Sequence, residues 1–175
     1  MNKITVACTA IVAGLLFTGE AFAEGVKMRV SLDTTATHIR TIQVGRYLEA
    51  VKEKSKGSIE PELFHSGQLF RDRDVGKALR QGGTEMAVPG TWVLGGFEPN
   101  IDFFSLPALY GQPREVVYKI SDGEVGQILN KSLEQKLKAK VIGKWLDLGS
   151  SHTYATKKLE HPDDIKGMKV RTSGG

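Results

Sequence analysis

Apolar positions recur with two different periods in the first half of the chain, which predicts alternating strands and helices. A short apolar strand covers 28–32. Apolar residues then follow at helical spacing, namely Ile39, Ile42, Tyr47, Leu48 and Val51. Thr37 stands where an N-cap is expected and Gly57 where a helix would stop, so we expect one helix between them.

The same alternation continues to about residue 88. Residues 59–63 alternate apolar and polar side chains, and Pro61 confines this strand to a sheet edge because proline has no N–H to donate. A helix is predicted from Asp72, whose charge suits a helix N-terminus, to the pair Gly82-Gly83. An apolar strand over 86–88 then ends at a Pro-Gly pair.

The second half of the chain has a less regular pattern. Residues 91–109 show no clear period and are expected to form loops and short turns. Two helices follow, one opened by Pro113 and one after Gly123. Strands are expected at three places and one helical turn at a fourth: strands over 141–148, 153–155 and 168–171, and the turn over 162–167.

This order of elements predicts an α/β fold with an open, mostly parallel sheet. With the proline-containing strand at the edge, the first three strands take the spatial order 2-1-3. Ligands in such sheets bind beyond the carboxyl ends of the strands, where the order reverses. Those ends are here the segments 33–35, 89–92 and 148–151.

The N-terminal residues have the layout of a secretory signal peptide. Lys3 gives the positive start, an apolar run covers 4–17, and Ala21-Phe22-Ala23 fits the A-x-A pattern of a cleavage site. The run is shorter than the roughly 20 apolar residues of a membrane-spanning helix. We expect cleavage after Ala23 and export to the periplasm, which also removes the single cysteine, Cys8.

Composition and motifs argue against nucleic-acid binding and against a nucleotide-dependent enzyme. The net charge is +4 and the charges are interspersed, which suits small anions and does not indicate nucleic-acid binding. Neither a phosphate-binding loop nor a dinucleotide fingerprint is present, and the four histidines are not spaced as metal ligands. No cofactor and no metal are therefore expected, and the missing catalytic set weighs against an enzyme.

Several side chains are candidates for ligand contacts. Arg171 ends a short apolar strand, and a guanidinium there can hold a carboxylate with two parallel hydrogen bonds. Trp92 and Trp145 are candidate pocket walls, although either can be ordinary packing. Asp33 can accept from a ligand hydroxyl or simply form a turn, and His38 fits a helix start better than a ligand contact.

Five stretches of sequence, taken in their order and spacing, resemble one known family. They are Lys54-Ser-Lys-Gly-Ser-Ile-Glu, Ser66-Gly-Gln-Leu followed by Arg71-Asp-Arg-Asp-Val, Gly83-Thr-Glu-Met-Ala, Phe104-Ser-Leu-Pro-Ala-Leu and His161-Pro-Asp-Asp-Ile-Lys-Gly-Met-Lys-Val-Arg. Together they resemble the DctP-type solute-binding proteins of TRAP (tripartite ATP-independent periplasmic) transporters, from about residue 27 to 175. The last stretch is the most specific.

The resemblance implies a two-lobed periplasmic receptor that closes on a small organic acid and delivers it to a membrane permease. It implies that Arg171 grips the ligand carboxylate and that Asp33, Thr91 and Trp92 line the cleft. Some members carry a second arginine after the lobe crossing, where this sequence has Gly149-Ser-Ser-His. Ser151 and His152 would then make lighter hydrogen bonds, and a smaller hydroxy, keto or dicarboxylic acid is favoured over a sialic acid.

Family members are longer, so the resemblance implies a domain plan that this sequence does not complete. We expect a signal peptide over 1–23, the first lobe over 24–148 and only the start of the second lobe over 149–175, from a fragment or a truncated gene. Two other functions stay open from the residues alone. One is a periplasmic α/β hydrolase or lyase with His152 or His38 as base, and the other is a sensing receptor for a signalling kinase.

Overall fold

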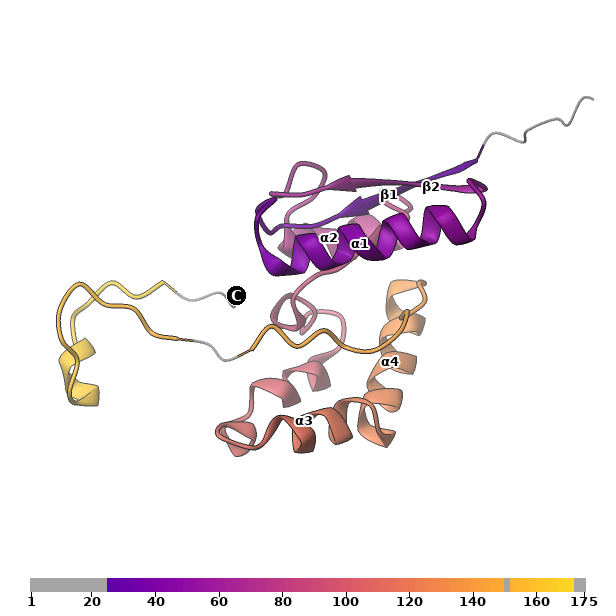
Figure 1. The fold of residues 1–175 in the computed structure, drawn as a ribbon. Coiled ribbons are helices and arrows are strands. Elements are labelled where there is room, and N and C mark those ends of the chain that lie inside the picture. The colour runs from indigo at the N-terminus through magenta and orange to yellow at the C-terminus, as the bar shows by residue number, and fades with distance from the viewer. Residues whose placement is uncertain (1–24, 150–151, 172–175) are drawn as a thin grey trace, which may run out of the picture.

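The computed structural model describes residues 25–149 and 152–171, so the predicted signal peptide and Ser151 lie outside the described residues. Three strands and two helices alternate at its start (Figure 1), as the apolar periods predict. They are β1 (Val26–Ser31), α1 (Ile39–Lys54), β2 (Ile59–Phe64), α2 (Asp72–Arg80) and β3 (Met86–Ala87).

The three strands form one parallel sheet in the order β2-β1-β3, which confirms the predicted order 2-1-3. The strand with Pro61 is at the edge, and Pro61 lies opposite Met28 of β1. Because this proline needs no partner for an N–H, the edge position costs the sheet no hydrogen bond. All three strands run parallel, so the loops that follow them emerge on the same side of the sheet, at the carboxyl ends of the strands, which we call the carboxyl edge.

Successive residues of β1 point to opposite faces of the sheet, as in any strand. On one face Val30 and Leu32 are buried against Val44 and Leu48 of α1. On the other, the Ser31 hydroxyl donates to the carbonyl of Phe70 (3.1 Å) and accepts from its N–H (3.2 Å), just before α2 begins. The two faces of β1 therefore carry α1 and the start of α2 respectively.

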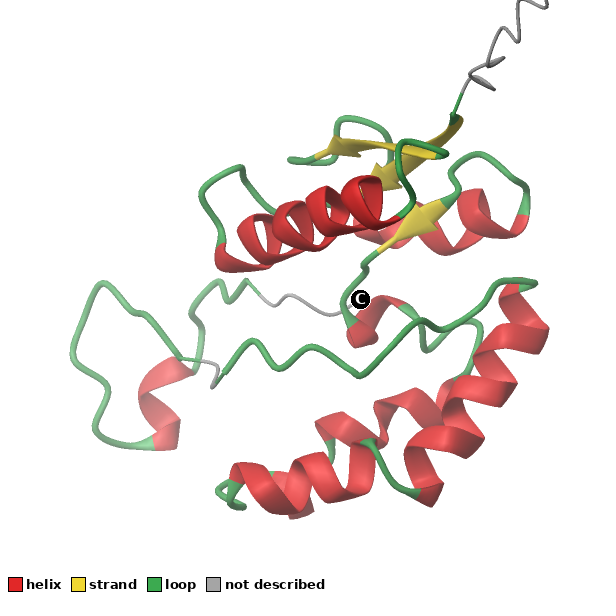
Figure 2. Cartoon of the chain, turned by 45° about the vertical axis from the view of Figure 1, so that its right-hand side comes forward, coloured by secondary structure: helices red, strands yellow, loops and turns green. Residues whose placement is uncertain are grey.

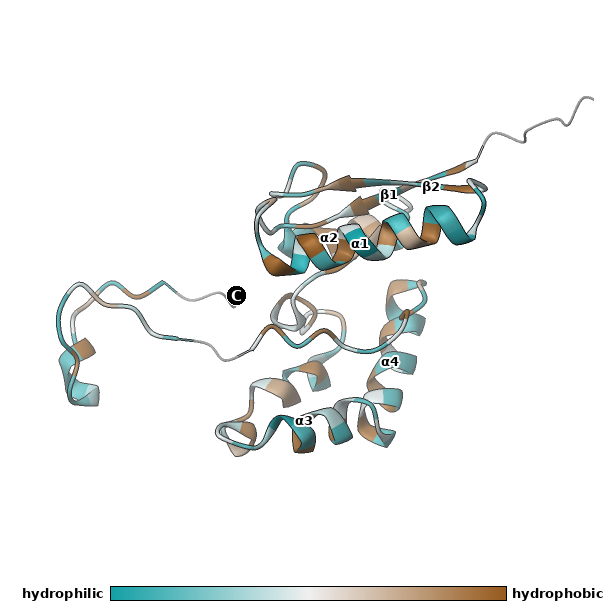
Figure 3. Ribbon diagram, viewed as in Figure 1, coloured by the Kyte–Doolittle hydropathy of each residue, from teal (hydrophilic) through white to brown (hydrophobic). Residues whose placement is uncertain are grey.

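The buried face of α1 differs from the predicted apolar stripe. Of the residues that predicted the helix, Ile39, Ile42 and Tyr47 are exposed, and Figure 3 shows apolar and polar residues mixed along α1. The residues buried on α1 are Arg40, Thr41, Val44 and Leu48. They recur at the spacing of one helix face, but two of them are polar, so of the buried residues the apolar pattern predicted only Leu48.

The start of α1 also differs from prediction. The N-cap is His38 and not Thr37, because the His38 Nδ1 accepts from the N–H of Arg40 at 3.0 Å. This satisfies a backbone donor that the first turn of a helix leaves unpaired. It agrees with the interpretation of His38 as a helix-start residue.

Three short 3₁₀ helices follow β3, in the region expected to hold loops and turns: η1 (Thr91–Val93), η2 (Pro99–Ser105) and η3 (Pro107–Leu109). The two predicted helices follow as α3 (Arg114–Ser121) and α4 (Glu124–Leu137). A second core forms where α4 packs on the 3₁₀ region, and its buried residues are Leu94, Ile101, Leu129, Leu133 and Leu137. Trp145 packs against this core, with its ring centroid 5.4 Å from that of Phe104.

The three strands predicted after α4 are wrong: the described residues of 139–149 and 152–171 contain no strand. Figure 2 shows this part as loop apart from one short 3₁₀ helix, η4 (Pro162–Ile165), which confirms the predicted turn. Ile142, Leu146 and Val170 are exposed here. A strand needs a neighbour for its backbone hydrogen bonds, and none pairs with these segments in the described ranges.

The helices of residues 25–149 and 152–171 are all too short or too polar to cross a membrane.

Candidate functional site

The loops at the carboxyl edge of the sheet are held together by backbone hydrogen bonds. The N–H of Ser66, after β2, donates to the carbonyl of Thr34, after β1, at 2.8 Å. The N–H of Gly67 donates to the carbonyl of Leu32 at 2.9 Å. These bonds leave the Asp33 side chain exposed between the two anchored positions. Asp33 thus has a fixed backbone and a carboxylate that is open to solvent.

The loop after β3 brings Thr91 and Trp92 to the same edge. The N–H of Val88 donates to the carbonyl of Ser31 at 3.3 Å, which extends the pairing with β1 as far as this loop. Gly90 then caps η1, which begins with Thr91 and Trp92. Thr91 is half-buried and Trp92 is 38% exposed. Three of the predicted ligand contacts, Asp33, Thr91 and Trp92, therefore lie in neighbouring loops.

Gly90 and Trp92 are in close contact. A Cβ placed on Gly90 would overlap the Trp92 indole ring. Gly90 has φ −72° and ψ 147°, a conformation that any residue adopts easily. Glycine is thus needed at this position for the space it leaves to the ring and not for its backbone freedom.

A buried ion pair that no sequence pattern predicts lies at this edge. The Arg40 guanidinium, from the first turn of α1, lies 3.5 Å from Oδ2 of Asp72, the first residue of α2. The two side chains are 4% and 11% exposed. The same carboxylate oxygen accepts from the N–H of Gly90 at 3.2 Å. In the sequence, Asp72 stands out by its charge at a helix start and by its place in the Arg71-Asp-Arg-Asp-Val stretch, and nothing links it to Arg40, which is 32 residues away.

Arg40 has one further polar neighbour. Its Nε donates to the Thr34 hydroxyl at 3.4 Å, and the hydroxyls of Thr34 and Thr41 lie 2.7 Å apart. The cluster therefore links the loop after β1, the start of α1, the start of α2 and the loop after β3.

The remaining predicted contacts lie in the last part of the chain. Arg171 and His152 are both exposed, and Ser151 is outside the described residues. The His152 ring lies 6.4 Å from that of Tyr154, centroid to centroid. Within residues 25–149 and 152–171, no hydrogen bond or ion pair joins Arg171 or His152 to the loops that carry Asp33 and Trp92.

A second buried carboxylate belongs to the α4 core rather than to this edge. Glu98 is 1% exposed and accepts from Lys136 Nζ at 2.7 Å, from the Ser132 hydroxyl and from the N–H of Asn100 at 3.0 Å. The contacts to Lys136 and Ser132 contribute most to lowering the pKa of Glu98 to about 2. Glu98 is thus ionised at neutral pH and ties the 3₁₀ region to α4.

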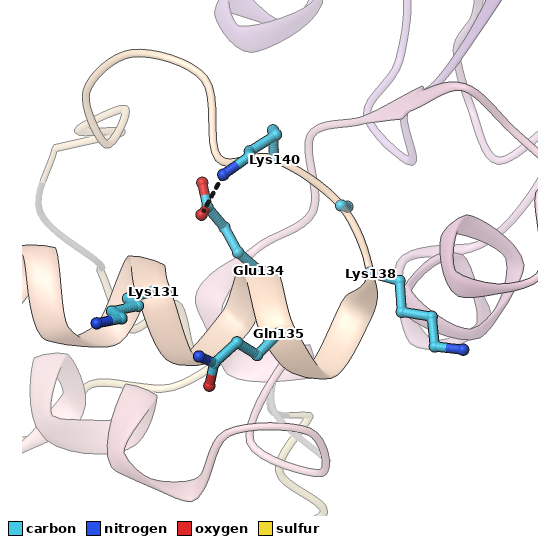
Figure 4. A pocket seen from close by; sticks show the side chains of 6 residues that line it. Lys131, Glu134, Gln135, Lys138 and Lys140 are labelled. Atoms are coloured by element: carbon cyan, nitrogen blue, oxygen red, sulfur yellow. Dashed lines mark hydrogen bonds and ion pairs between the residues drawn. The ribbon is translucent and has the colours of Figure 1, made fainter.

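The surface hollow shown in Figure 4 lies at the end of α4 and not at the sheet edge. Lys131, Gln135 and Lys138 line it, together with an ion pair of 2.9 Å between Lys140 and Glu134. This ion pair and the bond from the Val141 N–H at 3.1 Å lower the pKa of Glu134. The described part of the chain holds no cluster of three or more metal-ligating side chains.

Comparison with known proteins identifies the family. The family model described as bacterial extracellular solute-binding protein, family 7 (DctP), matches residues 30–174. A solute-binding protein of Chromohalobacter salexigens is 30% identical over 161 residues, which cover 84% of this chain and 47% of that protein. The chain spans about half the length of the curated relatives it matches.

Two solved structures of TRAP periplasmic solute-binding proteins are similar to this fold. One, from Sulfurospirillum deleyianum with bound succinate, is 27% identical with a TM-score of 0.59, and the matched region covers 63% of this chain and 36% of the chain in that structure. The other, from Sulfitobacter sp. with bound β-D-galacturonate, is 28% identical, with the same TM-score and the same coverage of both chains. The family consists of receptors, and the chain belongs to it: it is a member of family 7 of the bacterial extracellular solute-binding proteins, the DctP family.

Proposed function

We propose that this chain provides the first lobe, and the start of the second, of a TRAP-type receptor that captures a small organic acid in the periplasm. The observation that supports the proposal is that Asp33, Thr91 and Trp92 lie in the loops that follow β1 and β3, at the carboxyl edge of the sheet, in a member of the DctP family. Ligands of open parallel sheets bind at this edge. In this plan the first lobe covers 24–148 and the second begins at 149.

Arg171 is the proposed anchor of the ligand carboxylate. It follows the segment Met168-Lys169-Val170 and is exposed, so its guanidinium is free to meet an acid that enters between the lobes. A carboxylate held by two parallel N–H···O bonds is fixed in position and orientation, which a lysine ammonium does not reproduce. Asp33 would accept from a ligand hydroxyl, while Ser151 and His152 would add lighter hydrogen bonds.

The proposed partner is the membrane permease of a TRAP transporter, which would receive the acid from the closed receptor. The similar structures contain succinate and galacturonate, which share a carboxylate and differ in their hydroxyl groups. A carboxylate-binding receptor of this kind needs no chemical step, because binding is reversible and coupled to closure of the lobes.

Native mass spectrometry of the full chain, purified from the periplasm of its own host, tests the proposal. The expected result is a small acid that is present in the native mass and lost on denaturation. Arg171→Met should weaken its binding about 10- to 100-fold, because a hydrogen bond to a charged group is worth about 1.5–3 kcal/mol. Lys169→Met, two residues away on the same segment, is the matched control and should keep the acid.

Two results would contradict the proposed function. One is a chain that carries no acid and binds neither succinate nor galacturonate added at millimolar concentration. The other is an equal loss of binding in Arg171→Met and Lys169→Met, which would mean a general charge effect rather than a specific anchor.

A further inference from the structure

Three elements of the sheet unit meet at one carboxylate oxygen. Asp72 Oδ2 faces the Arg40 guanidinium of α1 at 3.5 Å and accepts from the N–H of Gly90 at 3.2 Å. Asp72 itself opens α2. Both charged side chains are almost fully buried, and within the described residues neither has another ion-pair partner.

A buried ion pair is a poor source of stability, because removing two charges from water costs about as much as their attraction returns. Its effect on geometry is clearer. Arg40 holds the Asp72 carboxylate in one place, and the carboxylate in turn holds the N–H of Gly90. The ion pair thus fixes the backbone at Gly90, in the loop after β3. Gly90 lies beyond Val88, whose N–H makes the last hydrogen bond between this loop and β1.

The position of Gly90 determines that of Trp92. The indole ring packs directly on Gly90, in the space that a Cβ would fill. Gly90 is also the cap from which η1 starts, so Thr91 and Trp92 follow any movement of its backbone. A shift at Asp72 is therefore transmitted to the two residues of this loop that we expect at the ligand.

We propose that Arg40 is a positioning residue of the ligand-binding edge, acting through Asp72 and Gly90 on Thr91 and Trp92. The proposal rests on the proposed function only in its statement that Thr91 and Trp92 face the ligand. It also assigns Asp72 a structural role: its Oδ2 is already shared between Arg40 and the Gly90 N–H, so this oxygen is not free for a ligand.

The test uses the two tryptophans of this chain as reporters. Each gives one indole N–H signal in a ¹H–¹⁵N NMR spectrum, and Trp92→Phe assigns the signal of Trp92. Trp145 is the internal reference, because it packs on the separate α4 core and donates to Asn130 at 2.9 Å. Arg40→Met should shift the Trp92 signal and leave that of Trp145 in place.

Rescue separates positioning from general destabilisation. In the double variant Arg40→Gln/Asp72→Asn both charges are removed together, so neither is left buried without its partner, and the Asn oxygen can still accept from Gly90. We expect the Trp92 signal to return toward its native position. Leu48→Ala, on the buried face of the same helix, removes packing from the core between α1 and the sheet but leaves the ion pair and the Gly90 hydrogen bond intact, so it should leave both signals unshifted in the folded protein.

If Arg40→Met does not fold, Arg40→Lys takes its place, since it keeps the charge and should give a smaller shift of the same signal. The proposal is overturned if the Trp92 signal stays at its native position in the Arg40 variants. It is equally overturned if Leu48→Ala moves that signal as far as Arg40→Met does. Neither outcome depends on a bound acid, so failure here and failure of the proposed function are told apart.

Discussion

The contact between Gly90 and Trp92 predicts that Gly90→Ala has opposite effects on the free energy of unfolding in the presence and in the absence of the Trp92 ring. The backbone of Gly90 suits any residue, so alanine should by itself stabilise the fold by about 0.4–1 kcal/mol, because it restricts the unfolded chain. In the native protein its Cβ would overlap the indole ring. Overpacking of this kind costs about 1–3 kcal/mol.

We therefore expect Gly90→Ala to lower the free energy of unfolding when Trp92 is present and to raise it when Trp92 is alanine. The coupling between the two positions equals the overlap cost, about 1–3 kcal/mol. Urea denaturation of the native chain, Gly90→Ala, Trp92→Ala and the double variant measures this coupling. Unfolding is followed by far-UV circular dichroism, which does not rely on tryptophan fluorescence. The Gly90 N–H is kept in every variant, so its bond to Asp72 is not at issue.

Gly45→Ala is the matched control. Gly45 lies inside α1, where a Cβ would make only an ordinary contact of 3.9 Å with Leu63. Alanine should stabilise the helix there by about 0.5–1 kcal/mol in both backgrounds. If Gly90→Ala behaves like this control and stabilises the protein with Trp92 in place, the packing of the ring on Gly90 is refuted.

Two further predictions concern the α4 core. Leu133→Ala should lower the free energy of unfolding by about 2–5 kcal/mol, because this side chain is 2% exposed. Ile128→Ala, at an exposed position of the same helix, should change it by less than about 0.5 kcal/mol. Urea denaturation midpoints of the two variants and the native chain measure the difference. The folded pKa of Glu98, about 2, lies below the ordinary value of 4.5, so its ionised form stabilises the fold above pH 4.5 and this contribution is lost as the pH falls toward 2. Urea midpoints measured between about pH 5 and 2 should therefore fall less steeply in Glu98→Gln than in the native chain, and equal slopes would contradict the ionic role of Glu98.

Regular elements of the first half could be predicted because their signals are local. The edge strand is fixed by Pro61, which lacks a donor, and the end of α1 by Gly57, which has a φ of +78°. The order of the sheet follows from these elements and from the short connections between them. The positions of Asp33, Thr91 and Trp92 at one edge follow in turn, since parallel strands end on the same side.

What the sequence alone determined is thus the set of local elements, the α/β class and the family motifs, because each depends on neighbouring residues. The tertiary structure decided which face of α1 is buried, since Arg40 becomes a core residue only when Asp72 lies opposite it. It also decided that 141–148 forms no strand, because strand formation needs a partner that local preference does not supply. The packing of the Trp92 ring on Gly90 was likewise decided by the tertiary structure, because it depends on the distance between ring and backbone in three dimensions, which the order of residues does not give.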